Sequence, residues 1–263
     1  RPGIAPGELL EAIREVEGLI VRSGTKVTRS VIAAAPKLRV IGRAGIGVDN
    51  VDVSAATERG IAVLNTPEGN NITTAEHAIS LLLSLARHIP AATASLKAGS
   101  WEKKKFTGME IYNRTLGVVG LGNIGRIVAL RAQGLGMKVV AYDPHISREA
   151  AVRLGVELTD FDELLSRADA ISVHVPRNKE TEGLLGAEAF ARAKRGVLIV
   201  NTARGGIVDE AALIASLRGA PLPMVKCVSN DIRVPADAEI VLEGYLDERG
   251  HVELEGPYGE FLG

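Results

Sequence analysis

Three glycines and an aspartate carry the strongest chemical signal in this sequence. The stretch TLGVVGLGNIGRIVALRAQGLGMKVVAYDP (115–144) places Gly120, Gly122 and Gly125 between an apolar, strand-like run and a helical pattern. A second strand-like run ends in Asp143, close to the ~20 residues that separate glycines from acid in dinucleotide sites. The free N–H groups and the positive end of such a helix hold phosphates. The pattern predicts a dinucleotide-binding turn. Asp143 would accept hydrogen bonds from ribose hydroxyls and repel a 2′-phosphate, which favours NAD over NADP.

Arg204 is the second group whose position suggests chemistry. In GVLIVNTARGGIVDEAAL (196–213) it comes just after the carboxyl end of a buried-strand pattern, where open parallel sheets bind their ligands. A guanidinium can grip a carboxylate with two hydrogen bonds and polarise the neighbouring carbonyl, as hydride transfer to a 2-keto acid requires. The alternative is a surface ion pair with Asp209 or Glu210, and position alone leaves the two interpretations nearly even.

These groups need a parallel sheet to position them. Short β-branched runs without polar alternation are typical of strands covered on both faces, and they occur at 18–21, 39–42, 62–65, 115–120, 138–143, 170–175 and 197–201. Helical patterns lie between them, at roughly 28–35, 51–59, 73–98, 123–136, 147–154, 160–167, 185–194 and 208–218. The alternation predicts an α/β fold with a doubly wound parallel sheet of the Rossmann type.

The composition excludes several classes of protein. The chain has 263 residues, of which 46% are hydrophobic and 24% charged, as in ordinary soluble globular proteins. Its net charge of −1 favours neither nucleic acid nor a membrane surface as partner. No stretch approaches the ~20 apolar residues of a membrane span. The single cysteine, Cys227, excludes an internal disulfide framework and fits the cytoplasm. We predict no metal site.

Residues 1 to about 219 resemble the D-2-hydroxyacid dehydrogenase family. The segments that carry the resemblance are GLIVRSGTKVT (18–28), VIGRAGIGVDNVD (40–52), LNTPEGN (64–70), WEKKKFTG (101–108), GLGNIGR (120–126), YDP (142–144) and NTARGGIVDE (201–210). The resemblance is strongest to the members that act on a phosphorylated 2-hydroxy acid. It implies NAD-dependent oxidation of 3-phosphoglycerate to 3-phosphohydroxypyruvate, at the start of serine synthesis.

The resemblance also implies roles for particular residues. Arg204 would be catalytic, binding and polarising the keto-carboxylate. Arg22 and Arg43 would face the substrate cleft, and backbone amides near Gly45 would help to hold the carboxylate. Solvated charge at the strand ends is the alternative for these two arginines. His174 would shape the nicotinamide pocket. The implied cofactor residues are Gly120, Gly122, Asn123, Ile124, Gly125, Asp143, Pro144, His174, Val175, Pro176, Thr202 and Ala203.

The proton relay of the family has no counterpart in the sequence. The family uses a histidine, oriented by a glutamate, from segments that follow the helix after the arginine, and no matching motif follows Arg204. We assign the role of proton donor to none of the five histidines, His77, His88, His145, His174 and His251. Without a positioned relay, the hydride step should lose about 10²–10⁴ in rate.

Residues 221–263 resemble a different family, the UbiD-type decarboxylases, through VPADAEIVLEGYLD and EGPYGEFLG. The acids Glu239 and Glu243 in this segment are interpreted as strand or loop residues. A flavin-dependent decarboxylase is therefore only a distant third functional hypothesis.

We predict a partial substrate-binding domain (1–72), a NAD-binding domain with a leading interdomain helix (73–220) and an unrelated appended segment (221–263). The resemblance implies that the first is an incomplete flavodoxin-like α/β domain, because the chain opens on a helix, and that the protein is a homodimer or a higher homo-oligomer. Two functions remain in competition. One is an impaired NAD-dependent dehydrogenase, and the other a non-catalytic NAD(H)-binding module or a truncated or chimeric fragment.

Overall fold

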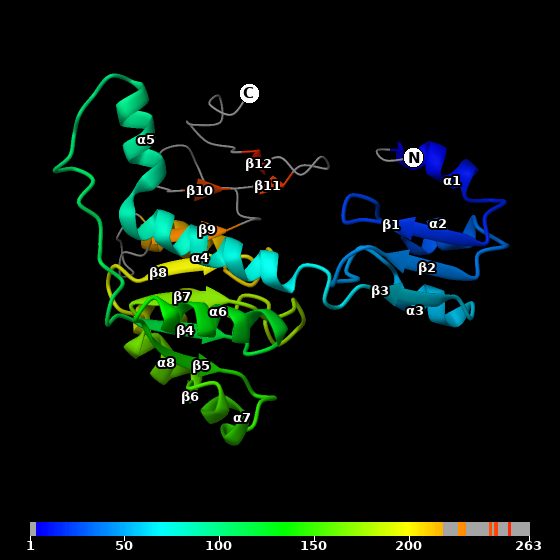
Figure 1. The fold of residues 1–263 in the computed structure, drawn as a ribbon. Helices are drawn as coiled ribbons and strands as arrows, with labels where there is room; N and C mark the ends of the chain where they lie inside the picture. Colours follow the sequence, from blue (N-terminus) through cyan, green and yellow to red (C-terminus); the bar gives the residue numbers. More distant parts are fainter. Residues whose placement is uncertain (1–3, 218–225, 230–241, 244, 247–251, 254–263) are drawn as a thin grey trace. The chain divides into compact units, whose positions relative to one another are not determined.

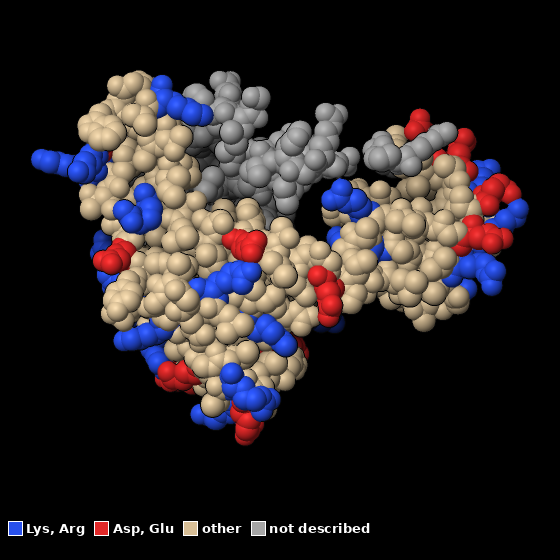
Figure 2. All heavy atoms as spheres, viewed as in Figure 1, with Lys and Arg blue, Asp and Glu red and all other residues tan. Residues whose placement is uncertain are grey.

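The computed structural model describes residues 4–217 together with 226–229, 242–243, 245–246 and 252–253. It divides into two compact units, Arg1–Asn71 and Ile72–Gly263 (Figure 1). Charged side chains of both signs are scattered over the face seen in Figure 2, in keeping with the net charge of −1. The predicted three-part organisation stays a prediction.

The first unit is built on a three-stranded parallel sheet in the order β1-β2-β3. Strands and helices alternate along the chain: α1 (Pro6–Ala12), β1 (Gly18–Val21), α2 (Arg29–Ala33), β2 (Val40–Arg43), α3 (Val53–Glu58) and β3 (Ala62–Asn65). The carboxyl ends of β1 and β2 therefore meet at one edge of the sheet, where Arg22 and Arg43 stand.

One face of this small sheet is uncovered. Val21 and Ile41 are buried in a single cluster with the apolar side chains of all three helices. On the other face Ile20 and Leu64 are 83% and 59% exposed, and no described helix of the first unit covers them. The prediction that the strands are covered on both faces is wrong here, because a short apolar run does not reveal how many faces will find partners.

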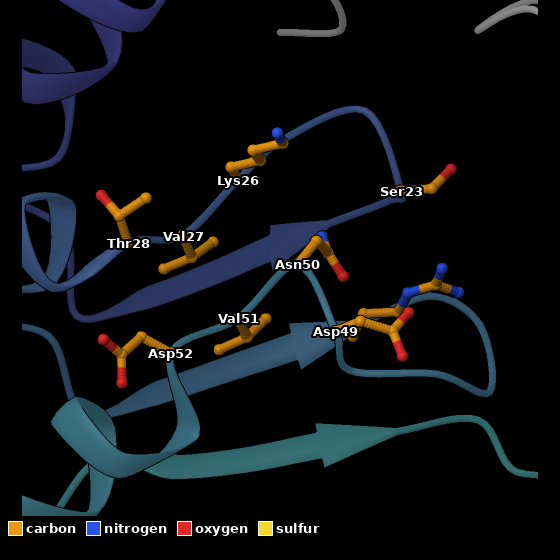
Figure 3. Close-up of a pocket in the computed structure, with 9 residues that line it drawn as sticks. Ser23, Lys26, Val27, Thr28, Asp49, Asn50, Val51 and Asp52 are labelled. Carbon is orange, nitrogen blue, oxygen red and sulfur yellow. The ribbon is translucent and has the colours of Figure 1, made fainter. Parts of the chain in front are cut away.

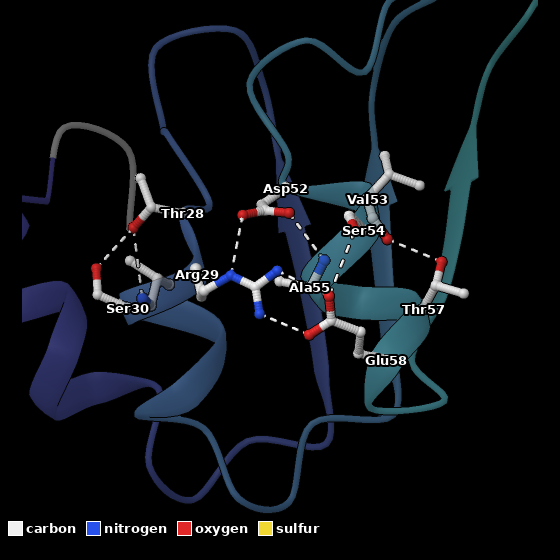
Figure 4. Close-up of polar contacts among 10 residues, drawn as sticks. Thr28, Arg29, Ser30, Asp52, Val53, Ser54, Ala55, Thr57 and Glu58 are labelled. Carbon is white, nitrogen blue, oxygen red and sulfur yellow. Dashed lines mark hydrogen bonds and ion pairs between the residues drawn. The ribbon is translucent and has the colours of Figure 1, made fainter.

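Exposed polar contacts surround the starts of α2 and α3 (Figure 4). The Thr28 hydroxyl caps α2, and the Asp52 carboxylate caps α3 by accepting the Ala55 N–H at 2.8 Å. Arg29 grips Glu58 with two hydrogen bonds of 2.6 and 2.9 Å, and this hydrogen bonding lowers the pKa of the Glu58 carboxyl. The caps fix where the two helices begin, whereas the exposed ion pair adds little.

The second unit contains a seven-stranded parallel sheet in the order β10-β9-β8-β7-β4-β5-β6. Its strands are β4 (Thr115–Val119), β5 (Lys138–Tyr142), β6 (Glu157–Leu158), β7 (Ala170–Val173), β8 (Leu198–Asn201), β9 (Lys226–Ser229) and β10 (Leu242–Glu243). Its helices are α4 (Asn71–Arg87), α5 (Ile89–Lys97), α6 (Asn123–Gly134), α7 (Arg148–Arg153), α8 (Phe161–Arg167), α9 (Ala187–Arg192) and α10 (Glu210–Leu217).

Helices cover both faces of this larger sheet. Val118 and Val200 point into a cluster formed with α4, α6 and α7. Val119 and Ile199, their neighbours in sequence, point into a second cluster formed with α8, α9 and α10. The predicted doubly wound parallel sheet is confirmed, and the fully buried strands explain why their sequences lack polar alternation.

The single helix predicted over 73–98 is wrong, because the chain bends by 61° between α4 and α5. His88 adopts a left-handed conformation at the break, with φ 53°. Pro90 has no N–H to donate to the Ala86 carbonyl oxygen, which accepts the Met109 N–H at 2.7 Å instead. Pro90 therefore cannot continue the hydrogen-bond ladder of α4, which ends at Arg87.

In the described part of the chain, no single helix is both long and apolar enough to cross a membrane. The bent pair α4 and α5 meets the criteria of length and composition when the two helices are taken together.

Two strands of the sheet lie in the segment predicted as an appendage. β9 pairs in parallel with β8, and β10 pairs with β9. Elsewhere in this segment β11 (Tyr245–Leu246) and β12 (Val252–Glu253) form an antiparallel pair. Glu243 lies in β10, and Glu239 and His251 lie outside the described residues.

Asp169 ties β4 to β7 where the two strands begin. Its carboxylate accepts the Thr115 N–H at 2.8 Å and lies 3.0 Å from the Lys194 ammonium. Partial burial opposes the charged form, but the Thr115 N–H and Lys194 outweigh it and lower the pKa of the Asp169 carboxyl.

An Asp169→Asn variant should therefore lose roughly 1 kcal/mol of unfolding free energy at pH 7. A depressed carboxyl pKa stabilises the fold above the unfolded value, near 3.9. The contribution is lost as the pH falls through the lower folded value, so the two proteins should converge in acid. Urea titrations between pH 7 and pH 2.5 measure this, and a difference that stays constant with pH would contradict it.

Candidate functional site

The glycine-rich turn lies where the order of the sheet reverses. The chain leaves β4 for β5 on one side and later returns to β7 on the other side of β4. In open α/β sheets, ligands bind outside the carboxyl ends of the strands at such a switch point. The turn Gly120–Gly122, which leads from β4 into α6, occupies this position.

The three glycines serve different purposes. Gly120 has φ 90°, and a Cβ atom there would lie 2.7 Å from the carbonyl oxygen of His174. A Cβ atom on Gly125 would lie 1.9 Å from the carbonyl oxygen of Gly120. Both residues are therefore required by the fold itself. A Cβ atom on Gly122 would meet no heavy atom within 4 Å, so open space lies before α6.

This opening fits a diphosphate. Gly122 is the N-cap of α6 and offers no side chain to the first-turn N–H groups, among them those of Asn123 and Ile124, which have no intrahelical partner. Those groups and the helix dipole favour an anion. The residues present fit the phosphates of a dinucleotide cofactor.

Asp143 holds the turn from the neighbouring strand. One carboxylate oxygen accepts the Leu121 N–H at 2.7 Å, and the other accepts the His145 N–H at 2.8 Å. Each oxygen has a further lone pair that can receive a ribose hydroxyl. Asp143, which Pro144 follows, can thus hold the glycine turn through its hydrogen bond to Leu121 and accept hydrogen bonds from the ribose at the same time.

Replacing Asp143 by Asn should weaken NADH binding about tenfold. An amide presents one acceptor oxygen, and its NH₂ group would oppose the Leu121 or His145 N–H. Fluorescence titration with NADH measures the affinity, and Asp162→Asn, at an exposed position of α8, is the control. Unchanged affinity in Asp143→Asn would remove this residue from the cofactor site.

His174 follows β7 beside the glycine turn. The backbone N–H of His174 donates to the Val119 carbonyl oxygen at 2.7 Å. The ring Nε2 of His174 lies 2.8 Å from the Ser172 hydroxyl oxygen. Burial lowers the pKa of His174 to about 4, so the imidazole is neutral near pH 7. Val175 also packs against Gly120, with its Cγ1 2.8 Å from where a Cβ atom would lie. Pro176, the third cofactor residue predicted in this segment, follows Val175 in the loop after β7.

The Arg204 loop follows β8, the next strand of the sheet. Val173 pairs with Asn201, so His174 and Thr202 leave neighbouring strands at the same edge. Arg204 is half-buried, and its Nη1 donates to the Ala203 carbonyl oxygen at 2.8 Å. The second unit thus brings the predicted cofactor residues and Arg204 together along the carboxyl ends of β4, β5, β7 and β8.

A pocket of about 500 Å³ opens in the first unit (Figure 3). It is lined by Ser23, Lys26, Val27, Thr28, Arg43, Asp49, Asn50, Val51 and Asp52. The side chain of Arg43 folds back over Gly45. A Cβ atom on Gly45 would lie only 1.1 Å from the Nη1 atom of Arg43. The Gly45 N–H donates to the Arg43 carbonyl oxygen at 2.9 Å. Arg22 is exposed, directly after β1.

Comparison with known proteins identifies the family. The model for the NAD binding domain of the D-isomer specific 2-hydroxyacid dehydrogenases matches residues 79–225. The chain belongs to this family. The match spans the glycine turn, Asp143, His174 and Arg204, so the second unit carries the NAD-binding domain of the D-isomer specific 2-hydroxyacid dehydrogenases.

Individual members of the family are also similar to this chain in sequence. The chain is 54% identical over 218 residues to a D-3-phosphoglycerate dehydrogenase of Archaeoglobus fulgidus, covering 83% of this chain and 41% of that protein. It is 54% identical over 212 residues to the Mycobacterium tuberculosis (H37Rv) protein of the same name, covering 81% and 40%. The chain thus spans about two-fifths of the length of these curated relatives.

Solved 2-hydroxyacid dehydrogenases share the fold. The apo-structure of Escherichia coli D-lactate dehydrogenase is 32% identical with a TM-score of 0.76, covering 85% of this chain and 70% of that one. The Aquifex aeolicus D-lactate dehydrogenase, complexed with NAD and lactic acid, is 30% identical with a TM-score of 0.77, covering 85% and 67%.

A second family model overlaps the dehydrogenase match. The Rift-related domain of 3-octaprenyl-4-hydroxybenzoate carboxy-lyase (UbiD) matches residues 200–263. Both resemblances seen in the sequence are therefore confirmed. The overlap lies at 200–225, which begins in β8.

The predicted site omits three polar residues that shape its loops: Ser172, Asn201 and Asn50. Ser172 and Asn201 are buried within strands that are otherwise apolar. A polar residue in such a strand needs a partner and is therefore a usable signal. Asn50 gives no such signal, because its partners lie 25 and 28 residues away.

Proposed function

We propose that this chain binds NAD(H) and oxidises 3-phosphoglycerate to 3-phosphohydroxypyruvate, as an enzyme of serine biosynthesis in the cytoplasm. The carrying observation is the glycine turn, with open space at Gly122, on the same sheet edge as Arg204. The relatives named D-3-phosphoglycerate dehydrogenase support this choice of substrate. When bound, NAD would accept the hydride from C2 of the hydroxy acid.

The arginines suit a substrate that carries a carboxylate and a phosphate. Arg204 can hold the carboxylate with two hydrogen bonds and draw charge toward the developing keto group. Arg22 is exposed after β1, and no side chain of the described residues pairs with its guanidinium. We assign the phosphate to Arg22 and Arg43, and we assign backbone amides near Gly45 to the carboxylate. The negative charge of Asp143 favours NAD over NADP.

Proton transfer sets the expected rate of turnover. His174 is neutral and tied to Ser172, and we assign proton transfer to no described histidine. We therefore expect turnover about 10²–10⁴ below that of an enzyme with a positioned relay.

Two measurements test the proposed function. NADH fluorescence titration should show saturable binding. NADH consumption with 3-phosphohydroxypyruvate should exceed the buffer background slowly but measurably. Binding without turnover would favour the second candidate, a non-catalytic NAD(H)-binding module, which the missing relay motivates. A folded protein that does not bind NADH would overturn both.

We further propose that the protein is a homodimer that pairs through its second unit. The helix α5 has no buried residue, and Leu96 on it is 58% exposed. Trp101, shortly after the helix, is 76% exposed. Sedimentation should show a dimer, and Leu96→Glu should shift it toward monomer. A monomeric wild-type protein at micromolar concentration would contradict this assembly.

A further inference from the structure

The side-chain amide of Asn50 closes the loop that begins with Arg22. Its Nδ2 donates to the Arg22 carbonyl oxygen at 2.8 Å and to the Thr25 carbonyl oxygen at 2.7 Å. These two acceptors stand at the ends of a four-residue loop. Figure 3 shows Asn50 directed toward the end of β1, beside Ser23. One amide group therefore fixes both ends of the loop at once.

Backbone hydrogen bonds anchor the chain on which Asn50 lies. The Val27 N–H donates to the Asn50 carbonyl oxygen at 2.7 Å, and the Asp52 N–H donates to the Val27 carbonyl oxygen at 2.9 Å. Val27 and Val51 form a parallel bridge and are both buried. Asn50 is thus anchored to the core on the far side of the loop that it holds.

Asparagine amides also donate to carbonyl oxygens in the other two arginine-bearing loops. Asn65 Nδ2 donates to the Ile46 carbonyl oxygen at 2.7 Å, in the loop after Arg43. In the second unit, Asn201 Nδ2 donates to the Arg204 carbonyl oxygen at 3.0 Å, and its Oδ1 accepts the Ala203 N–H at 3.0 Å. A short, uncharged group that donates to carbonyl oxygens suits a site that must attract anions.

We propose that Asn50 is a positioning residue for the substrate anion, acting through the backbone of Arg22. The inference rests on the proposed function. A loop held at both ends presents the Arg22 guanidinium without the entropy cost of ordering it at binding. Losing the amide should therefore weaken substrate binding and leave the hydride step, which belongs to the second unit, nearly unchanged.

The test compares two amides of matched chemistry. Asn50→Leu removes both donors, keeps the branched shape and adds no charge near an anionic substrate. The control is Gln133→Met at the end of α6, where Nε2 also donates to two carbonyl oxygens, those of Leu154 at 3.1 Å and Gly155 at 2.8 Å. Both variants lose the same number of hydrogen bonds.

Asn50→Leu should raise KM for 3-phosphohydroxypyruvate about tenfold, with kcat within threefold and NADH affinity unchanged. Gln133→Met should leave KM unchanged at a comparable loss of thermal stability. A KM for Asn50→Leu within twofold of wild type, or an equal rise in both variants, would overturn the inference. Should Asn50→Leu not fold, Asn50→Ser, which keeps one donor, replaces it under the same criteria.

Hydrogen exchange separates this inference from the proposed function. If the wild-type chain does not turn over, the proposed function fails by itself. The amides of residues 22–26 should still exchange at least tenfold faster in the Asn50 variant than in wild type or Gln133→Met. Unchanged exchange in this loop would then overturn the positioning role.

Discussion

Gly122→Ala is expected to fold as wild type and to lose about 10- to 100-fold in NADH affinity. The added methyl group meets no protein atom within 4 Å, and the backbone at Gly122, with φ −71°, suits any residue. The methyl group would instead fill the space before α6 that we assign to the diphosphate. Thermal unfolding and NADH fluorescence titration, on the same preparation, measure the two quantities.

Gly125→Ala is the matched contrast within the same turn. Its methyl group would lie 1.9 Å from the Gly120 carbonyl oxygen, so the turn has to move. We expect this variant to lose thermal stability as well as affinity. If Gly122→Ala binds NADH as wild type does, the space before α6 is not the phosphate site, and the cofactor assignment of the turn is wrong.

Arg204→Lys should lower kcat/KM for 3-phosphohydroxypyruvate by about 10²–10³ while leaving NADH affinity unchanged. Lysine keeps the charge but cannot offer two parallel N–H groups to a carboxylate. The loop itself should persist, because Asn201 holds it through backbone groups of Ala203 and Arg204. Single-turnover measurements at saturating NADH are suited to the slow reaction expected here.

Arg192→Lys on α9 controls for the substitution itself. Arg192 is exposed and pairs with Asp162 of α8 at 2.8 Å, outside the strand-end loops of the proposed site. It should retain wild-type kinetics. Equal rates for Arg204→Lys and wild type would assign Arg204 a structural role and would leave the chain without its proposed carboxylate-binding group.

Much of the second unit could be predicted from local pattern. The runs 115–120, 138–143, 170–175 and 197–201 contain the observed strands β4, β5, β7 and β8. These strands are buried on both faces, so each must be apolar along its whole length. The glycine turn could be recognised from its spacing, although Gly120 is required by its contact with His174 at the end of a distant strand.

The first unit shows where local pattern is insufficient. The strands predicted at 18–21 and 62–65 are β1 and β3 with the same limits. Yet Ile20 and Leu64 lie on a face that no described helix of the first unit covers. An apolar residue records a tendency to be buried, and whether a partner reaches it depends on other parts of the chain.

The sequence by itself determined the strand and helix alternation, the glycine turn with Asp143, and the place of Arg204 after a buried strand. These features follow from local apolar patterns and from a fixed spacing of glycines and acid along the chain. Tertiary structure alone decided that the Ala86 carbonyl oxygen would accept the Met109 N–H, and that Asn50 would hold the Arg22 loop. Those hydrogen bonds join groups more than 20 residues apart, and their partners are chosen by packing of the whole unit, which no local periodicity encodes.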